Sequence, residues 1–206
     1  SDVSLTLLED FPGLDGTECV ILAHCQPETA SSEQIDRVEE ALKKRNSSLS
    51  VVRTYFEPEV MGDYEEMKQE LTGKSIMYLG TAPKKVKDKI LSSLEENYGC
   101  KVISASFELS RDDLMRRDID SAMKSDEKPD MFLVEIKARG VEGVRYIREQ
   151  YGVPCKYLNN IPVEVDRYGH RVENNKNLDR LILEALNRGV ERFNKREDKK
   201  FPLMKF

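Results

Sequence analysis

The sequence is poor in the residues that bind metals and form disulfide frameworks. Its 206 residues include no tryptophan, two histidines and four cysteines. The cysteines form no C-x-x-C pair, and two histidines are too few to complete a zinc shell. Neither a metal site nor a disulfide framework is therefore expected. Scattered thiols suit a reducing compartment, so we expect a cytoplasmic protein.

Long apolar runs are also missing. No run approaches the roughly 20 residues that a membrane-spanning helix needs, and the first residues, Ser1-Asp2-Val3, show no basic or apolar signal region. We therefore expect a protein that neither enters a membrane nor is exported. The apolar share of 39%, against 34% charged residues, is low for a globular protein. The apolar residues nevertheless come in short dense runs, which is typical of a folded α/β chain and not of a disordered one.

Acidic residues outnumber basic ones except near the end of the chain. The sequence has 33 Lys and Arg against 38 Asp and Glu, a net charge of -5. Residues 187–206 hold seven basic and three acidic residues, a net of +4, so residues 1–186 carry -9. Because acidic residues interrupt this basic segment, we interpret it as a solvated helix end and expect no nucleic-acid partner.

What the chain does contain is a repeated alternation of short apolar runs and helical periods, with a spacing typical of βα units and parallel strands. Runs that are apolar almost throughout indicate burial on both faces of a sheet. This pattern predicts an α/β fold, a three-layer Rossmann-like domain with a mainly parallel sheet. The expected strands are residues 19–23, 50–54, 75–79, 101–104, 131–136 and 155–158.

Helix start and stop signals lie between the expected strands. Ser31 with Gln34 has the pattern of a capping box, and Gly152 with Pro154 would end a helix over residues 140–151. Further starts are expected at Thr81-Ala82-Pro83, at Ser110 with Asp113, and at Asn177, where a long helix reaches Phe193.

One segment breaks the alternation. Residues 57–73 hold Pro58, Gly62, Gly73 and many acids, so we expect a βαβ unit over residues 1–57, a linker over 58–73 and a Rossmann-like domain with a terminal helix over 74–206. A single βαβ unit cannot bury a two-faced sheet by itself. We therefore expect this unit to join a sheet that another segment supplies.

The common catalytic motifs are absent. The sequence contains no G-x-x-x-x-G-K-[ST], G-x-G-x-x-G, G-x-S-x-G or H-E-x-x-H. His24 and Cys25 are adjacent, but a nucleophile pair needs a geometry that adjacency does not supply, and a packed loop thiol is the simpler interpretation. Any chemistry must then come from side chains at the carboxyl ends of the strands, where open parallel sheets bind ligands.

Three strand ends offer polar groups. Thr81 and Ala82, followed by Lys84, could bind an anion through backbone amides and positive charge, although an ordinary capped turn explains them as well. Ser106 and Arg111 could equally be a helix cap and a surface base. Asn159 and Asn160, after the last strand, could bind a ligand or only satisfy backbone groups.

The strand over residues 131–136 gives the clearest signal. Alternation puts Glu135 and Lys137 on one side of it, and charged groups at such a place are costly unless they are paired or lie at the open end. Either the two form a structural ion pair, or Glu135 orients Lys137 toward an anionic ligand. Arg139 adds a second base beside Lys137.

Beyond these signals, residues 75–165 resemble the C-terminal part of the archaeal and bacterial cyclic 2,3-diphosphoglycerate synthetase family. Cys19–Glu28 is similar to the family's T-M-C-E strand, although it has His24 for Met and Gln26 for Glu. Glu108 also departs from the family pattern. The matching segments are Gly80–Pro83, Tyr98–Val102, Leu109-Ser110 with Leu114 and Arg117-Asp118, Asp130–Ala138, and Asn160–Val163.

The resemblance implies a ligase that uses ATP with Mg²⁺ and K⁺ to close an intramolecular phosphoanhydride in 2,3-diphosphoglycerate. It also implies that residues 1–57 are the end of a P-loop-type nucleotide-binding domain. We therefore expect a P-loop partner segment, and we expect this chain alone to be incomplete. No cofactor is assured by this chain alone. The predicted catalytic residues are Lys137 and Glu135. The predicted substrate-binding residues are Thr81, Ala82, Lys84, Ser106, Arg111, Arg139 and Asn160.

The sequence leaves two other functions open. The chain could be a non-catalytic α/β module that docks on a P-loop NTPase, or a relative that acts on another phosphorylated metabolite. In each case we expect a homo-oligomer. If the chain is part of the ligase, its expected ligand is a small phosphorylated metabolite.

Overall fold

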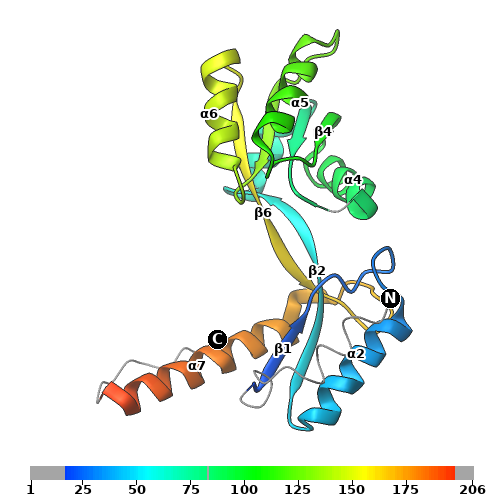
Figure 1. The fold of residues 1–206 in the computed structure, drawn as a ribbon, viewed down its shortest axis with the longest axis vertical. Helices are drawn as coiled ribbons and strands as arrows, with labels where there is room; N and C mark the ends of the chain where they lie inside the picture. Colours follow the sequence, from blue (N-terminus) through cyan, green and yellow to red (C-terminus); the bar gives the residue numbers. More distant parts are fainter. Residues whose placement is uncertain (1–16, 83, 198–206) are drawn as a thin grey trace. The chain divides into compact units, whose positions relative to one another are not determined.

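The computed structural model describes residues 17–82 and 84–197, apart from the side chains of Lys84 and Glu197. The chain forms two compact units. The first comprises Ser1–Phe56 and Pro162–Phe206, and the second comprises Glu57–Ile161. Figure 1 follows the chain through both units, which two long strands, β2 (Ser50–Val60) and β6 (Cys155–Glu164), connect covalently. Each unit has its own core.

The second unit is built on parallel strands in the order β6-β5-β3-β4. The crossover helices between them follow from the alternation in the sequence. Besides the ends of β2 and β6, its elements are α3 (Tyr64–Leu71), β3 (Ser75–Leu79), the 3-10 turn η2 (Lys84–Val86), α4 (Lys87–Tyr98), β4 (Lys101–Ser106), α5 (Asp112–Lys124), β5 (Met131–Glu135) and α6 (Gly140–Tyr151).

Helices cover both faces of this sheet. In β3, Ile76 and Tyr78 pack into a cluster with the buried residues of α3 and α4. Met77 and Leu79, which point the other way, pack with α5 and α6. Alternate side chains of the strand therefore enter two different cores, as the runs that are apolar almost throughout predicted. The expected three-layer Rossmann-like architecture is confirmed.

The first unit contains a βαβ arrangement. Its strand β1 (Cys19–Leu22) pairs in parallel with β2, and α2 (Ser32–Arg45) connects them. Leu42 of α2 packs against Val20 and Val51. On another cluster, Leu178 and Leu181 of α7 (Lys176–Glu197) pack against Val52. A 3-10 turn, η3 (Glu173–Asn175), precedes α7.

The structure contains all six expected strands, and β2 and β6 run further than the sequence predicts. The capping box is confirmed, because Ser31 and Gln34 exchange side-chain and backbone hydrogen bonds. The expected starts at Thr81 and Ser110 are wrong: α4 and α5 begin at Lys87 and Asp112, and neither has a capping side chain. Thr81 does not cap α4 because its amide and hydroxyl donate to a buried carboxylate instead.

The division of the chain differs from the expected boundaries. Residues 58–73, expected as a linker, contain the end of β2 and helix α3. Met67 and Leu71 lie one helical turn apart and are buried in the second unit's core, which gives this segment a packing role. Residues 162–206 belong to the first unit rather than to the Rossmann-like domain.

Candidate functional site

A buried carboxylate collects hydrogen bonds at the carboxyl end of β5. Glu135 is only 1% exposed. Its Oε1 accepts from the Tyr78 hydroxyl at 2.8 Å and from Asn160 Nδ2 at 2.9 Å. Its Oε2 accepts from the Thr81 amide at 3.0 Å and the Thr81 hydroxyl at 3.2 Å, and lies 3.2 Å from Lys137 Nζ. Five donors, from the ends of β3 and β5 and from within β6, therefore meet at one side chain, which we call the Glu135 cluster.

Strand register explains why these residues meet. Tyr78 lies opposite Leu133, and Glu135 lies opposite Leu158. Since side chains two positions apart share a face, Glu135 and Asn160 project on the same face as Leu133 and Leu158. Leu133, Leu158 and Tyr78 all belong to the core under α3 and α4. A long tyrosine side chain reaches the diagonal position two residues further along the neighbouring strand.

A tight turn after β5 brings Lys137 back over Glu135. Ala138 adopts a positive φ of 51°, which costs a non-glycine residue of the order of 1–3 kcal/mol. The Gly140 amide donates to the Lys137 carbonyl at 3.0 Å. A Cβ at Gly140 would lie 2.3 Å from the Glu135 carbonyl oxygen, so the turn excludes any side chain there. Such strain persists where the surrounding structure holds it, as it often does at functional sites.

The protonation of Tyr78 is fixed by its surroundings. Burial and then the charge of Glu135 raise the pKa of Tyr78 far above its usual value of 10.0. The phenol therefore stays protonated and donates to Glu135 at every physiological pH. Lys137, in contrast, has a side chain that is 50% exposed, so the cluster has one buried neutral donor and one cation that solvent reaches.

The structure brings together four of the residues that the sequence singled out: Glu135, Lys137, Thr81 and Asn160. Ala82 lies in the same loop and packs against the core under α3 and α4. The side chain of Lys84 lies outside the described part of the chain.

The other expected site residues interact with acidic side chains elsewhere. Arg139 Nε lies 3.4 Å from Asp112 Oδ1 on α5, and Arg111 Nη1 lies 3.3 Å from Glu108 Oε2. Ser106 Oγ donates to Asp118 Oδ2 at 2.7 Å. No contact of these three residues with Glu135 or Lys137 is among the interactions of the described residues.

Sequence reasoning missed Tyr78 and Gly80. One signal was available: Tyr78 is the only residue with a polar tip between Ile76 and Leu79, and a buried tyrosine hydroxyl needs a partner. The role of Gly80 can be recognised only from the structure. A Cβ there would lie 2.1 Å from the Tyr78 hydroxyl, so the absence of a side chain leaves room for the phenol.

His24 and Cys25 do not form a nucleophile pair. Cys25 is buried and its Sγ donates to the Leu22 carbonyl at 3.3 Å, while the His24 ring packs edge-on against Phe56. Burial raises the pKa of the Cys25 thiol, which disfavours the reactive thiolate. Among residues 17–82 and 84–197, no three His, Cys, Asp or Glu side chains gather into a group that could hold a metal ion.

A buried thiol also makes the stability of the fold depend on pH. Burial raises the pKa of Cys100 from 9.0 to about 11. Below pH 9 the thiol is neutral in both states; above it the unfolded state ionises first. We therefore expect Cys100 to lower the free energy of unfolding by roughly 2–3 kcal/mol between pH 9 and pH 11. Urea unfolding at several pH values, in the wild type and in Cys100→Ala, measures this. Parallel pH profiles for the two proteins would contradict it.

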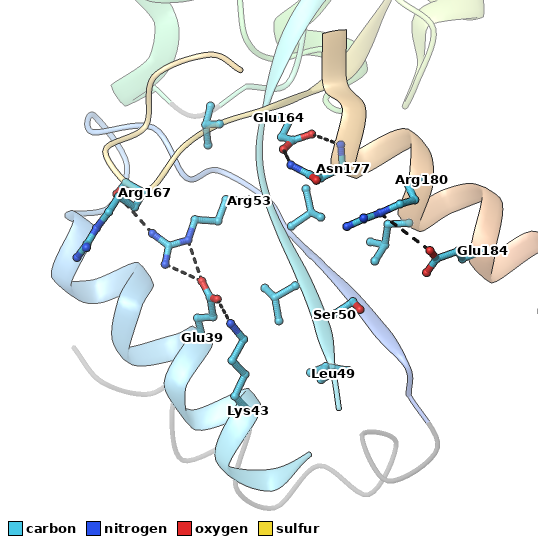
Figure 2. A pocket seen from close by; sticks show the side chains of 14 residues that line it. Glu39, Lys43, Leu49, Ser50, Arg53, Glu164, Arg167, Asn177, Arg180 and Glu184 are labelled. Carbon is cyan, nitrogen blue, oxygen red and sulfur yellow. Dashed lines mark hydrogen bonds and ion pairs between the residues drawn. The ribbon is translucent and has the colours of Figure 1, made fainter. Parts of the chain in front are cut away.

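The first unit contains a pocket of about 490 Å³ with charged walls (Figure 2). Its most buried cation, Arg53, donates to Glu39 Oε2 at 2.6 Å and to Asp36 Oδ1 at 2.6 Å. Lys43 also pairs with Glu39. A hydrogen bond from Arg53 holds the pKa of Asp36 below its usual value. Arg53 and Lys43 are therefore paired with acids, as Lys137 is with Glu135.

Within the described residues, no helix combines the length and the apolar character needed to cross a bilayer.

Comparison with known proteins identifies relatives of the chain. Residues 68–161, which contain the whole Glu135 cluster, match the family described as cyclic 2,3-diphosphoglycerate synthetase C-terminal domain. The cyclic 2,3-diphosphoglycerate synthetase of Methanothermus fervidus is 33% identical over 177 residues, 85% of this chain and 35% of that protein. That of Methanothermobacter thermautotrophicus is 30% identical over 180 residues, 87% of this chain and 35% of that protein.

The chain thus spans about a third of the length of the curated relatives it matches. The similarity nevertheless extends over both units, since it covers most of the chain. It confirms the resemblance seen in the sequence: residues 68–161 match the C-terminal domain of the cyclic 2,3-diphosphoglycerate synthetase family, and most of the chain is similar to synthetases of that name.

Proposed function

We propose that the second unit binds the anionic substrate of an ATP-dependent synthesis of cyclic 2,3-diphosphoglycerate, with Lys137 as the principal contact. The observation that carries the proposal is the convergence of Lys137, Thr81 and Asn160 on Glu135 at the carboxyl edge of the sheet. Ligands of open α/β sheets bind at that edge. The family of the relatives supports the choice of substrate.

The cluster has donors to spare for a ligand. A lysine ammonium carries three N–H donors and an asparagine amide carries two. Lys137 directs its ammonium to Glu135 Oε2, and Asn160 directs its amide to Oε1. Each can therefore meet a phosphate oxygen without leaving Glu135. Because Glu135 is anchored by buried groups, it would orient Lys137 and reduce the conformational freedom that binding has to remove.

The chemistry of the substrate requires such a cation. In 2,3-diphosphoglycerate, which also carries a carboxylate, the two phosphates must approach each other before the ring closes, against like-charge repulsion. Positioning and electrostatic stabilisation are therefore the main tasks of a protein that catalyses this phosphoryl transfer. A half-exposed ammonium over a buried carboxylate supplies local positive charge on the solvent side.

ATP, Mg²⁺ and K⁺ belong to the proposal only as groups bound elsewhere. The sequence contains no G-x-x-x-x-G-K-[ST] loop for a triphosphate, and the described residues contain no group of acids and histidines fit for a metal. The described residues therefore offer no site that fits a nucleotide with its metal ion. A P-loop segment from outside the chain would have to supply the nucleotide site. This chain would contribute the substrate site.

Isothermal titration with 2,3-diphosphoglycerate tests the proposal. Lys137→Ala should abolish measurable binding at low ionic strength, because it removes the principal cation of the site. Lys101→Ala is the matched control: Lys101 is 66% exposed and pairs with Glu127, at the opposite end of the strands. It should bind as the wild type does. Equal binding by Lys137→Ala and the wild type would contradict the proposal.

The same experiment separates the alternative functions. Binding of another phosphorylated metabolite, without binding of 2,3-diphosphoglycerate, would indicate a relative with another substrate. Absence of binding together with stable self-association would favour the docking module. An observation that suits docking is the exposure of Ile182, Leu186 and Phe193 on α7.

A further inference from the structure

The hydroxyl of Tyr78 is the buried anchor of the Glu135 cluster. Tyr78 is 0% exposed and Glu135 is 1% exposed, and their hydrogen bond is 2.8 Å long. The other group on Oε1, Asn160, lies on the partly exposed side of the cluster. The Tyr78 ring is held by a tilted contact with Phe107, with centroids 5.4 Å apart. A packed phenol therefore meets Oε1 of the carboxylate through a buried hydrogen bond.

We propose that Tyr78 is a positioning residue for the anion site. By holding Oε1, it fixes the rotation of the carboxylate, so that Oε2 stays directed at the Thr81 amide and the Lys137 ammonium. The torsion at the end of a glutamate side chain is soft, which makes an external anchor necessary. The part of this inference that concerns ligand binding rests on the proposed function.

Gly80 provides the space that the Tyr78 hydroxyl occupies. Its backbone follows β3 directly, and a Cβ there would lie 2.1 Å from the Tyr78 hydroxyl and 2.5 Å from the carbon that bears it. A glycine at this position is what lets the phenol reach past the strand end to Glu135. The sequence Tyr78-Leu79-Gly80-Thr81 thus supplies the anchor, the room for it and one of the donors that it aligns.

The test compares Tyr78→Phe with Tyr98→Phe. Tyr98 is also buried in this core, and its hydroxyl accepts from the Val60 amide at 2.9 Å, with no bond to Glu135. Each variant loses one buried hydroxyl. In Tyr78→Phe the Thr81 amide proton should shift upfield in the ¹H–¹⁵N spectrum and exchange faster, and 2,3-diphosphoglycerate should bind roughly tenfold more weakly. In Tyr98→Phe both quantities should remain those of the wild type.

The outcomes are distinguishable. If Tyr78→Phe leaves the Thr81 amide and the affinity unchanged, the positioning role is overturned. If the wild type does not bind the probe, the proposed function fails, while the Thr81 amide shift still decides whether Tyr78 aligns the cluster.

A measurement on the wild type covers the case in which Tyr78→Phe does not fold. A hydroxyl proton that donates to a buried carboxylate should exchange slowly and be visible at low temperature, with a nuclear Overhauser effect to the Asn160 side-chain amide. The absence of such a proton for Tyr78 would overturn the proposal, and its presence would support it. Gly80→Ala, which crowds the hydroxyl, should abolish that signal.

Discussion

Replacing Glu135 by alanine is expected to lower the free energy of unfolding by about 3–5 kcal/mol, the cost of removing one partner of a buried charged network. The reason lies in the donors that remain. The Tyr78 hydroxyl, the Thr81 amide and the Asn160 amide would lose their common acceptor. Each buried donor left without a partner costs of the order of 1–3 kcal/mol. Chemical unfolding of the purified protein measures the effect.

Glu127→Ala provides the control for this variant. Glu127 is also a carboxylate of the second unit that pairs with a lysine, Lys101, but it is 57% exposed. An exposed pair contributes about 0–1 kcal/mol, so this variant should unfold almost as the wild type does. If Glu135→Ala were as stable as Glu127→Ala, the carboxylate would not be the centre of a buried network.

Much of this cluster could be predicted from the sequence, because strand ends are visible in it. A charged residue at the end of an apolar run, as Glu135 is, has to be paired or to lie at the open edge. Thr81 and Lys137 follow β3 and β5, as the rule that parallel strands end at one edge predicts, whereas Asn160, expected after the last strand, lies within β6. The structure places all three within hydrogen-bond or ion-pair distance of Glu135.

The partners of the remaining polar residues depend on geometry that the sequence does not contain. Ser106, Arg111 and Arg139 also lie at or near strand ends, yet each interacts with an acid close by: Asp118, Glu108 and Asp112. Asp112 and Asp118 lie on α5, so their contacts with Arg139 and Ser106 depend on where that helix packs. Glu108 lies three residues before Arg111, outside the helix. Tyr78 was missed for a related reason, since its partner depends on the register between β3 and β5.

The boundaries of the units could not be predicted because two long strands, β2 and β6, each belong to both units. The run over residues 155–158 predicted a short strand, whereas β6 continues to Glu164. Through this continuation the chain enters the first unit at Pro162, and Leu178 packs there with Val52. An apolar stripe on a helix predicts that the helix packs on a sheet, but it does not say which part of the chain provides that sheet.

Glu164 is the second buried carboxylate that supports a large prediction, and its role differs from that of Glu135. It is 4% exposed, and its oxygens accept from the Asn177 amide at 2.8 Å and the Asn177 side chain at 2.6 Å (Figure 2). They also accept from the Leu178 amide at 3.0 Å. These amides belong to the first turn of α7, where backbone donors have no partner within the helix. A negative charge there also interacts favourably with the helix dipole.

Glu164→Ala should therefore destabilise the first unit by about 2–4 kcal/mol, the combined cost of a lost helix cap and of buried donors without a partner. Because the loss begins at the first turn of α7, amide hydrogen exchange along Leu178 and Leu181 should accelerate more than exchange in α2. Glu184→Ala, an exposed acid on the same helix, should change neither quantity. Uniform acceleration in both helices would indicate that Glu164 stabilises the unit as a whole rather than the start of α7.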